Sequence, residues 1–88
     1  MEICELCNLV SGHIVTRVYY RDTKVIILDC LTCEIPMVVF RHHGAASLSE
    51  TRHAETIIDE LFNYDTIRKE ARRIPNHEHW HIEGGVLR

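Results

Sequence analysis

The sequence lacks several features that mark common functional classes. It has two prolines, four glycines and one tryptophan in 88 residues, and no apolar run approaches the roughly 18–20 residues of a membrane-spanning helix. The net charge is −3, which is not the charge of a chain built to bind a nucleic-acid backbone. Neither a glycine-rich phosphate loop nor a Gly-x-Ser-x-Gly turn occurs. We therefore expect no membrane and no nucleic acid among its partners.

The chain also opens without a recognisable targeting segment. Residues 1–5 have neither the basic nor the hydrophobic stretch of a signal peptide. We expect a cytoplasmic location, where paired cysteines bind metals or take part in redox chemistry more often than they form disulfides. The length predicts a single domain over residues 1–88. A domain of this size has a free energy of unfolding of only about 4–13 kcal/mol.

Cysteine and histidine are what the chain does have in excess. Four cysteines and seven histidines account for eleven of its 88 residues, or one position in eight. Both side chains bind transition metals, and histidine also titrates near neutral pH. The positions of these residues therefore carry most of the functional information.

Alternating and continuous apolar patterns predict four strands, separated by a turn at 21–24 and a loop at 30–35. The strands cover residues 14–20, 25–28, 36–41 and 77–83. In the first, the side chains expected on one face are those of Ile14, Thr16, Val18 and Tyr20. The second is continuously apolar, as in a central strand buried on both faces, and ends at Asp29.

A helix is predicted after the third strand. Ser47 and Glu50 form a capping box, and an apolar stripe follows at Ala54, Ile57, Ile58, Leu61, Phe62 and Tyr64. Residues 63–66 interrupt this helix, and Asp65 is expected to cap a second helical piece that ends before Pro75. The order β-β-β-α-β predicts an α+β fold in which one helical segment covers a small antiparallel sheet.

The strongest chemical signal is three alternating histidines in the last strand. His77, His79 and His81 are expected on one face, about 6.6 Å apart, and Glu78, Trp80 and Ile82 on the other. Imidazole is a metal ligand, a nucleophile and a general acid or base near pH 7. A polar strand with solvated histidines is the alternative.

A second signal is the Cys4-x-x-Cys7 pair, whose spacing suits one tetrahedral zinc ion. Two more ligands are needed, and the candidates are Cys30 with Cys33, the pair at 42–43, or the histidine strand. The four cysteines together have zinc-ribbon spacing. A redox role is less favoured because neither pair opens a helix after a strand. Alternatively, Cys30 and Cys33 are small loop residues.

Other polar residues give weaker signals. Asp29 lies at a strand end, where a carboxylate binds sugar hydroxyls or, more often, caps a turn. Basic residues in 68–73 can attract an anionic substrate or simply solvate a helix end. His13 and His53 have no partner in the sequence and are expected at the surface, whereas Trp80 is expected in the core.

These segments together resemble the histidine triad (HIT) family, in the family's order and over nearly the whole chain. The matching segments are 4–12, 17–22, 25–29, 37–43 and the triad strand 77–82. The resemblance implies a nucleotide-binding α+β fold, usually a homodimer, that hydrolyses or transfers nucleoside monophosphates from phosphoanhydride or phosphoramidate substrates. It implies that His79 is the nucleophile, that His81 lies beside the phosphate and that Asp29 binds the ribose.

The same resemblance implies a zinc site. In zinc-containing relatives the metal is held by the two N-terminal cysteines, the family's fourth histidine and the first triad histidine. Here those positions are Cys4, Cys7, His43 and His77. Such a zinc would tie the N-terminal segment to the triad strand and support the geometry around His79.

The chain departs from the family pattern at the segment that normally contacts the phosphate. Residues 72–76 replace it, so Asn76, Arg72 or Arg73 would have to supply the donors, and Glu78 stands where the family has an apolar residue. Three functions therefore remain: a zinc-bearing nucleotidyl hydrolase or transferase, an inactive module that keeps the fold and the zinc, and a four-cysteine zinc-ribbon module.

Overall fold

The computed structural model describes residues 7, 10, 16–30, 34–42, 44–69 and 77–88. Cys4, His43, Asn76 and Cys33 lie outside these residues. The elements in chain order are β1 (Val18–Arg21), β2 (Val25–Asp29), β3 (Pro36–Phe40), α2 (Leu48–Leu61), β4 (Phe62–Asn63), β5 (Thr66–Arg68), β6 (His79–Glu83) and β7 (Val86–Leu87). No helix among the described residues is long and apolar enough to cross a membrane.

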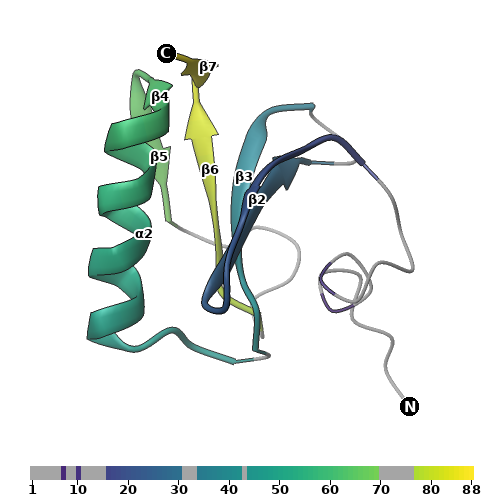
Figure 1. Cartoon of the computed structure of the whole chain (residues 1–88), viewed down its shortest axis with the longest axis vertical. Coiled ribbons are helices and arrows are strands. Elements are labelled where there is room, and N and C mark those ends of the chain that lie inside the picture. Colours follow the sequence, from purple (N-terminus) through teal and green to yellow (C-terminus); the bar gives the residue numbers. More distant parts are fainter. Residues whose placement is uncertain (1–6, 8–9, 11–15, 31–33, 43, 70–76) are drawn as a thin grey trace.

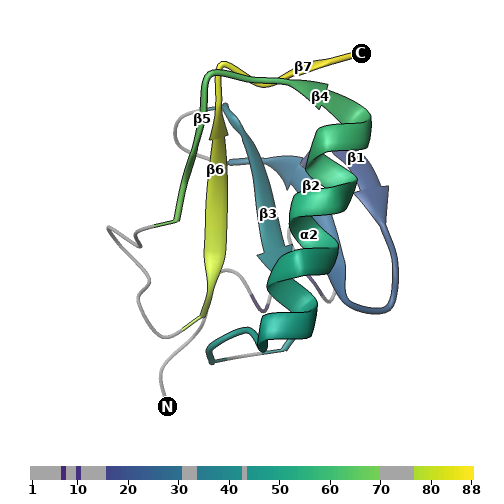
Figure 2. The ribbon, with the colours of Figure 1, turned by 90° about the vertical axis from the view of Figure 1, so that its left-hand side faces the viewer.

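A five-stranded antiparallel sheet forms the centre of the molecule, and α2 lies against one face of it (Figures 1 and 2). The strand order is β1-β2-β3-β6-β5, so β6 lies between β3 and β5. β4 and β7 pair separately as a two-stranded sheet. The α+β class and the antiparallel sheet predicted from the sequence are confirmed.

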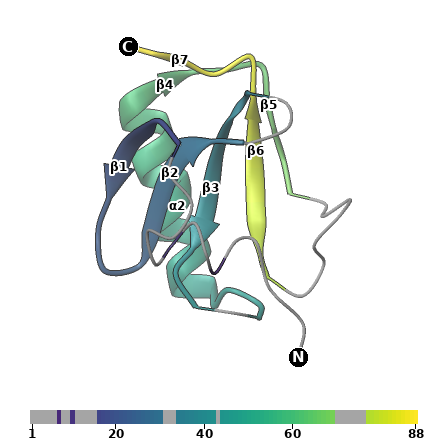
Figure 3. The same ribbon diagram turned by 90° about the vertical axis from the view of Figure 1, so that its right-hand side faces the viewer.

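Side-chain alternation gives the sheet two apolar faces. The helix face, which packs on α2, carries Val25, Ile27, Val38, Phe40, Trp80 and Ile82. The histidine face, on the other side, carries Ile26, Leu28, Met37, Val39, His79 and His81. Figure 3 views the sheet from the side away from α2. β2 and β3 have continuous apolar sequences because both faces of these strands are buried.

The expected alternation in the first strand is wrong. Val18 pairs with Leu28 on the histidine face, but Tyr20 pairs with Ile27 on the helix face, because the register shifts between them. An extra residue in a strand, here Tyr19, moves every following side chain to the opposite face. Both tyrosines pack against the core on the helix face.

The helix begins as predicted. Ser47 Oγ accepts a hydrogen bond from the Glu50 N–H, and a Glu50 carboxylate oxygen accepts one from the Ser47 N–H. These two bonds satisfy donors that the first turn cannot satisfy by itself. Ala54 and Ile58 are buried on the face that meets the sheet.

The second helical piece is wrong, and the layout β-β-β-α-β is therefore incomplete. Phe62 is already extended (φ −125°, ψ 147°), and β5 pairs with β6 instead of continuing a helix. The Asp65 N–H donates to the Glu83 carbonyl oxygen and leads the chain into this pairing. The buried β6 would otherwise lack a hydrogen-bonding partner along one side, and β5 supplies it. The local cap and charge signals in 65–69 did not reveal this tertiary requirement.

The last strand is shorter than predicted. β6 begins at His79, and His77 instead forms an isolated parallel bridge with Gly44. Gly44 has a φ of 98°, a conformation that glycine adopts without the steric cost a side chain adds. The two backbone segments are joined by a hydrogen bond from the Glu78 N–H to the Gly44 carbonyl oxygen. These contacts hold Gly44, in the chain that follows β3, next to the residues that lead into β6.

Candidate functional site

His79 is the first residue of β6 and pairs with Val39 of β3, and its ring has a defined orientation. The residue is 6% exposed, and its Nδ1 lies 2.9 Å from the His77 carbonyl oxygen. A carbonyl oxygen only accepts, so Nδ1 carries the hydrogen. In the neutral ring the lone pair is then on Nε2. This arrangement leaves Nε2 as the nucleophilic or ligating atom of His79.

His81 lies beside His79 on the same face. Their ring centroids are 5.6 Å apart with an interplanar angle of 68°. His81 is 7% exposed and pairs with Met37 on one side and Arg68 on the other. The structure thus brings the two expected catalytic histidines together on the histidine face.

His77 is fully buried and contacts the N-terminal cysteine pair through Cys7. Its Nε2 donates to the Phe40 carbonyl oxygen at 2.5 Å, and its Nδ1 lies 3.4 Å from the Cys7 sulfur. Because Nε2 carries the hydrogen, the Nδ1 lone pair faces the sulfur. A backbone carbonyl on the far nitrogen is the usual way in which proteins orient a metal-binding histidine.

The distance between Cys7 and His77 fits two ligands of one zinc ion. Tetrahedral bonds of about 2.3 Å to sulfur and about 2.0–2.1 Å to nitrogen place these ligand atoms about 3.5–3.6 Å apart. The observed separation of 3.4 Å is close to that value. Within the described residues no three metal-binding side chains gather. The other two expected ligands, Cys4 and His43, lie outside that part of the chain.

His42 is directed elsewhere. It is exposed, and its Nε2 lies 2.9 Å from both carboxylate oxygens of Glu50 at the start of α2. The Ser47 N–H and His42 together lower the pKa of Glu50 to about 2. The sequence left open which member of the His42–His43 pair faces the site, and His42 faces the helix cap.

Glu78 is the anomalous residue of the triad strand, and the structure explains it. One carboxylate oxygen accepts the Ala46 N–H at 2.8 Å, and the other accepts the Trp80 indole N–H at 3.0 Å. Trp80 is buried, as predicted, and packs edge-to-face on Phe40. Glu78 thus holds the back of the triad strand against the loop that leads to α2.

Asp29 is not brought to the histidines. Its neighbours Leu28 and Cys30 pack on the histidine face, so alternation directs Asp29 toward the helix face. There its Oδ1 accepts the Tyr19 hydroxyl at 2.6 Å. Burial and this hydrogen bond raise the pKa of Tyr19. The side chain of the residue expected to bind ribose is therefore used within the fold.

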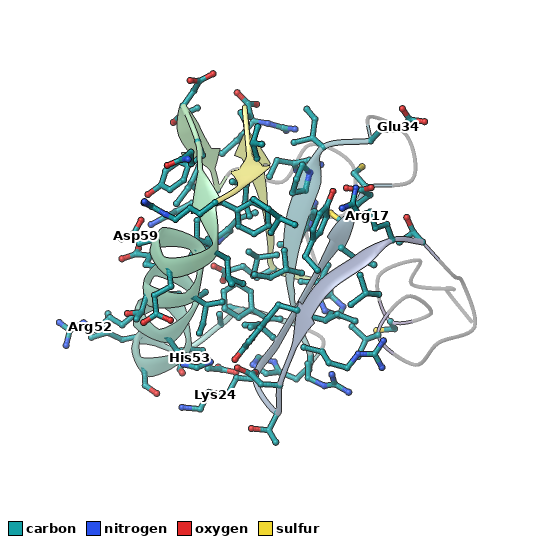
Figure 4. The ribbon with its side chains drawn as sticks, turned by 45° about the horizontal axis from the view of Figure 1, so that its top comes forward. Arg17, Lys24, Glu34, Arg52, His53 and Asp59 are labelled. Atoms are coloured by element: carbon teal, nitrogen blue, oxygen red, sulfur yellow. The ribbon has the colours of Figure 1, made fainter. Side chains whose placement is uncertain are left out.

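His53, expected at the surface without a partner in the sequence, is half-buried in the structure and has a partner there. His53 points from α2 toward the β1–β2 turn near Lys24 (Figure 4), and its Nε2 lies 2.6 Å from Asp22 Oδ2. Asp22 also accepts from the Tyr20 hydroxyl and from two backbone N–H groups of the turn. Burial acts to raise the pKa of Asp22, but these hydrogen bonds outweigh it and hold the pKa well below its ordinary range. No local sequence signal indicated this contact, which joins residues 31 apart.

Arg68 is the residue of the site that sequence reasoning misplaced. It was expected in a second helical piece, but it lies on β5 directly opposite His81 and forms an ion pair with Glu83 at 2.9 Å. Lys69, next in the chain, lies instead over the Trp80 ring and binds Glu55. The β-branched Thr66 and Ile67 were the available strand signal.

No family model matches the chain, and no curated protein or solved structure matches it significantly.

Proposed function

We propose that this chain is a HIT-like nucleotide-binding protein that hydrolyses or transfers nucleotidyl groups through a covalent intermediate on His79. The observation that carries the proposal is the hydrogen bond from His79 Nδ1 to the His77 carbonyl oxygen. It directs the Nε2 lone pair of a largely buried imidazole away from the backbone. A nucleophile held in one tautomer needs no rearrangement before it attacks.

The reaction would proceed in two displacements. The Nε2 lone pair forms a bond to the phosphorus, and the bond to the leaving group breaks with its electron pair on the leaving group, which takes up a proton when it is an amine. Water then attacks the same phosphorus and loses a proton to solvent, and the P–N electron pair returns to Nε2. His81, with its ring 5.6 Å from that of His79, lies where it can contact the phosphoryl oxygens.

The proposal includes a structural zinc held by Cys4, Cys7, His43 and His77. Its support is the 3.4 Å approach of Cys7 to His77 and the carbonyl that fixes the His77 ring. When bound, zinc would supply a fixed charge and a cross-link at the start of β6. Cys30 packs beside the apolar cluster of the histidine face, which favours its interpretation as a loop residue.

The inactive-module alternative is also supported by one observation. Asp29 is hydrogen-bonded to Tyr19 on the helix side, so a ribose would have to displace that contact or be bound by other groups. A protein with this arrangement can keep the zinc and the fold without turnover.

Trapping separates these functions. The wild-type chain is incubated with an adenosine phosphoramidate or with diadenosine polyphosphate, quenched and analysed by intact mass. We expect a nucleotidyl adduct that His79→Ala abolishes and that the control His42→Gln retains, since the exposed His42 ring contacts Glu50 at the start of α2. Nucleotide binding without an adduct in the wild type favours the inactive module. The absence of both adduct and binding refutes the proposal.

Metal analysis tests the zinc assignment separately. We expect one zinc per chain, retained in the double variant Cys30→Ser, Cys33→Ser and weakened in Cys7→Ser. Loss of the metal in the double variant would instead support the four-cysteine ribbon. X-ray absorption would count two sulfur and two nitrogen ligands for the proposed site.

A further inference from the structure

An arginine lies next to the paired histidines on the same face of the sheet. Arg68 is the direct antiparallel partner of His81. Directly opposed residues in such a pair project to the same face, with Cβ atoms about 4.5–5.5 Å apart. His79 lies one two-residue step, about 6.6 Å, further along β6. Glu83, which contacts the Arg68 Nε, lies one such step from His81 in the opposite direction, so the guanidinium flanks His81 on the side away from His79.

The guanidinium is held by one carboxylate and keeps donors for another ligand. Arg68 Nε lies 2.9 Å from Glu83 Oε1, and the two side chains are 19% and 39% exposed. No other described residue accepts from its Nη groups. Guanidinium presents several donors in a rigid plane that matches two oxygens of a phosphate.

The neighbouring cation does not share this position. Lys69 contacts the Trp80 ring at 4.6 Å and Glu55 at 2.6 Å, which places it toward the helix face. Within the described part of β5 and its end, Arg68 is therefore the cation on the histidine face. Arg68 and Lys69 are therefore a matched pair of basic residues that are adjacent in the sequence but lie on opposite faces of the sheet.

We propose that Arg68 is the side chain that binds the phosphoryl group at this site, through its Nη donors, with Glu83 restraining the guanidinium. The inference rests on the proposed function and deepens it, because it identifies the substrate's anionic phosphoryl oxygens as the group recognised. As His79 Nε2 forms its bond to phosphorus, negative charge concentrates on the non-bridging oxygens. Arg68 stabilises that charge and supplies donors in place of the absent phosphate-contact segment.

The test measures the rate of nucleotidyl-His79 formation in Arg68→Gln, Arg68→Lys and Lys69→Gln. We expect Arg68→Gln to lower kcat/KM about 100-fold, mainly through kcat, because one donor to a developing oxyanion contributes about 10²–10³-fold. Arg68→Lys keeps the charge without the planar fork and should recover part of the loss. Lys69→Gln should stay near the wild type, as should Arg52→Gln, whose side chain points into solvent from α2 (Figure 4).

Calorimetry provides a readout that a purely structural role would not change selectively. Arg68→Gln should weaken binding of adenosine 5′-monophosphate at least tenfold and leave binding of uncharged adenosine unchanged. An adduct formed by Arg68→Gln at the wild-type rate would refute the role of Arg68 and leave the proposed function intact. Equal losses in Arg68→Gln and Lys69→Gln would also refute it. If the wild type forms no adduct and binds adenosine monophosphate no better than adenosine, the proposed function and this inference both fail.

Discussion

Replacement of Glu78 by alanine should destabilise the protein strongly, although the residue is neither apolar nor catalytic. The substitution removes the acceptor for the Ala46 N–H and for the Trp80 indole N–H. A hydrogen bond to a charged group contributes about 1.5–3 kcal/mol. Because Glu78 is half-buried, the lower end applies, and two such bonds amount to about 3 kcal/mol.

That loss is a large part of the total stability. The free energy of unfolding expected for 88 residues is about 4–13 kcal/mol. At about 4–8 °C per kcal/mol for a domain of this size, Tm should fall by about 12–24 °C. The Tm of Glu78→Gln should lie between those of the wild type and Glu78→Ala, because one amide oxygen replaces two carboxylate oxygens as acceptor.

The assay is urea unfolding, and Trp80, the only tryptophan in the chain, reports by fluorescence on the site of the change. Circular dichroism is used for Trp80→Phe and for the double variant, which together complete a double-mutant cycle. The coupling between Glu78 and Trp80 should be about 1 kcal/mol or more. Glu60→Gln, on the exposed side of α2, is the control. A Glu78→Ala cost below about 0.5 kcal/mol, or additive single variants, would refute the reasoning.

Three further predictions address the metal, the helix cap and the core. Chelation of the proposed zinc should lower Tm, and added zinc should restore it, because a structural zinc site can contribute as much free energy as the whole fold. If chelation leaves the Tm of the wild type unchanged and Cys7→Ser has the Tm of the wild type, the zinc site is refuted. The pKa of Glu50 in the folded state is lowered to about 2. Ionised Glu50 therefore stabilises the fold fully above its ordinary pKa near 4.5, and this stabilisation disappears as the pH falls toward 2. Glu50→Gln should flatten the pH dependence of the free energy of unfolding between these two pH values. Ile58→Ala, at a fully buried position, should cost about 2–5 kcal/mol in urea unfolding and more than Ile57→Ala, which is half-buried.

Much of the architecture could be predicted because its signals are local. The Ser47–Glu50 capping box determines where α2 begins, and the uninterrupted apolar residues of 25–28 identify a strand buried on both faces. Because side chains alternate along residues 79–82, the histidines lie on one face of the sheet and Trp80 and Ile82 on the other. Each of these conclusions depends on neighbours within one turn or one pleat.

The errors arose where a distant partner controls a local choice. Residues 66–68 form a strand because β6 requires a hydrogen-bonding partner, although Asp65 and the following cations resemble a helical segment. The register shift near Tyr19 reverses the faces of β1, and no composition signal marks it. His53 meets Asp22 only because α2 packs across the sheet beside the β1–β2 turn.

The candidate site divides in the same way. The alternation of three histidines in the last strand and the zinc-ligand spacing of a cysteine pair near the start follow directly from the order of the residues. In contrast, the approach of Cys7 to His77, the direction of Asp29 toward the helix side and the position of Arg68 opposite His81 depend on how distant segments pack and pair. Residue type and spacing specify chemistry and local periodicity, whereas register and strand order specify which of those residues share a face. A one-residue change in register exchanges the faces of a whole strand.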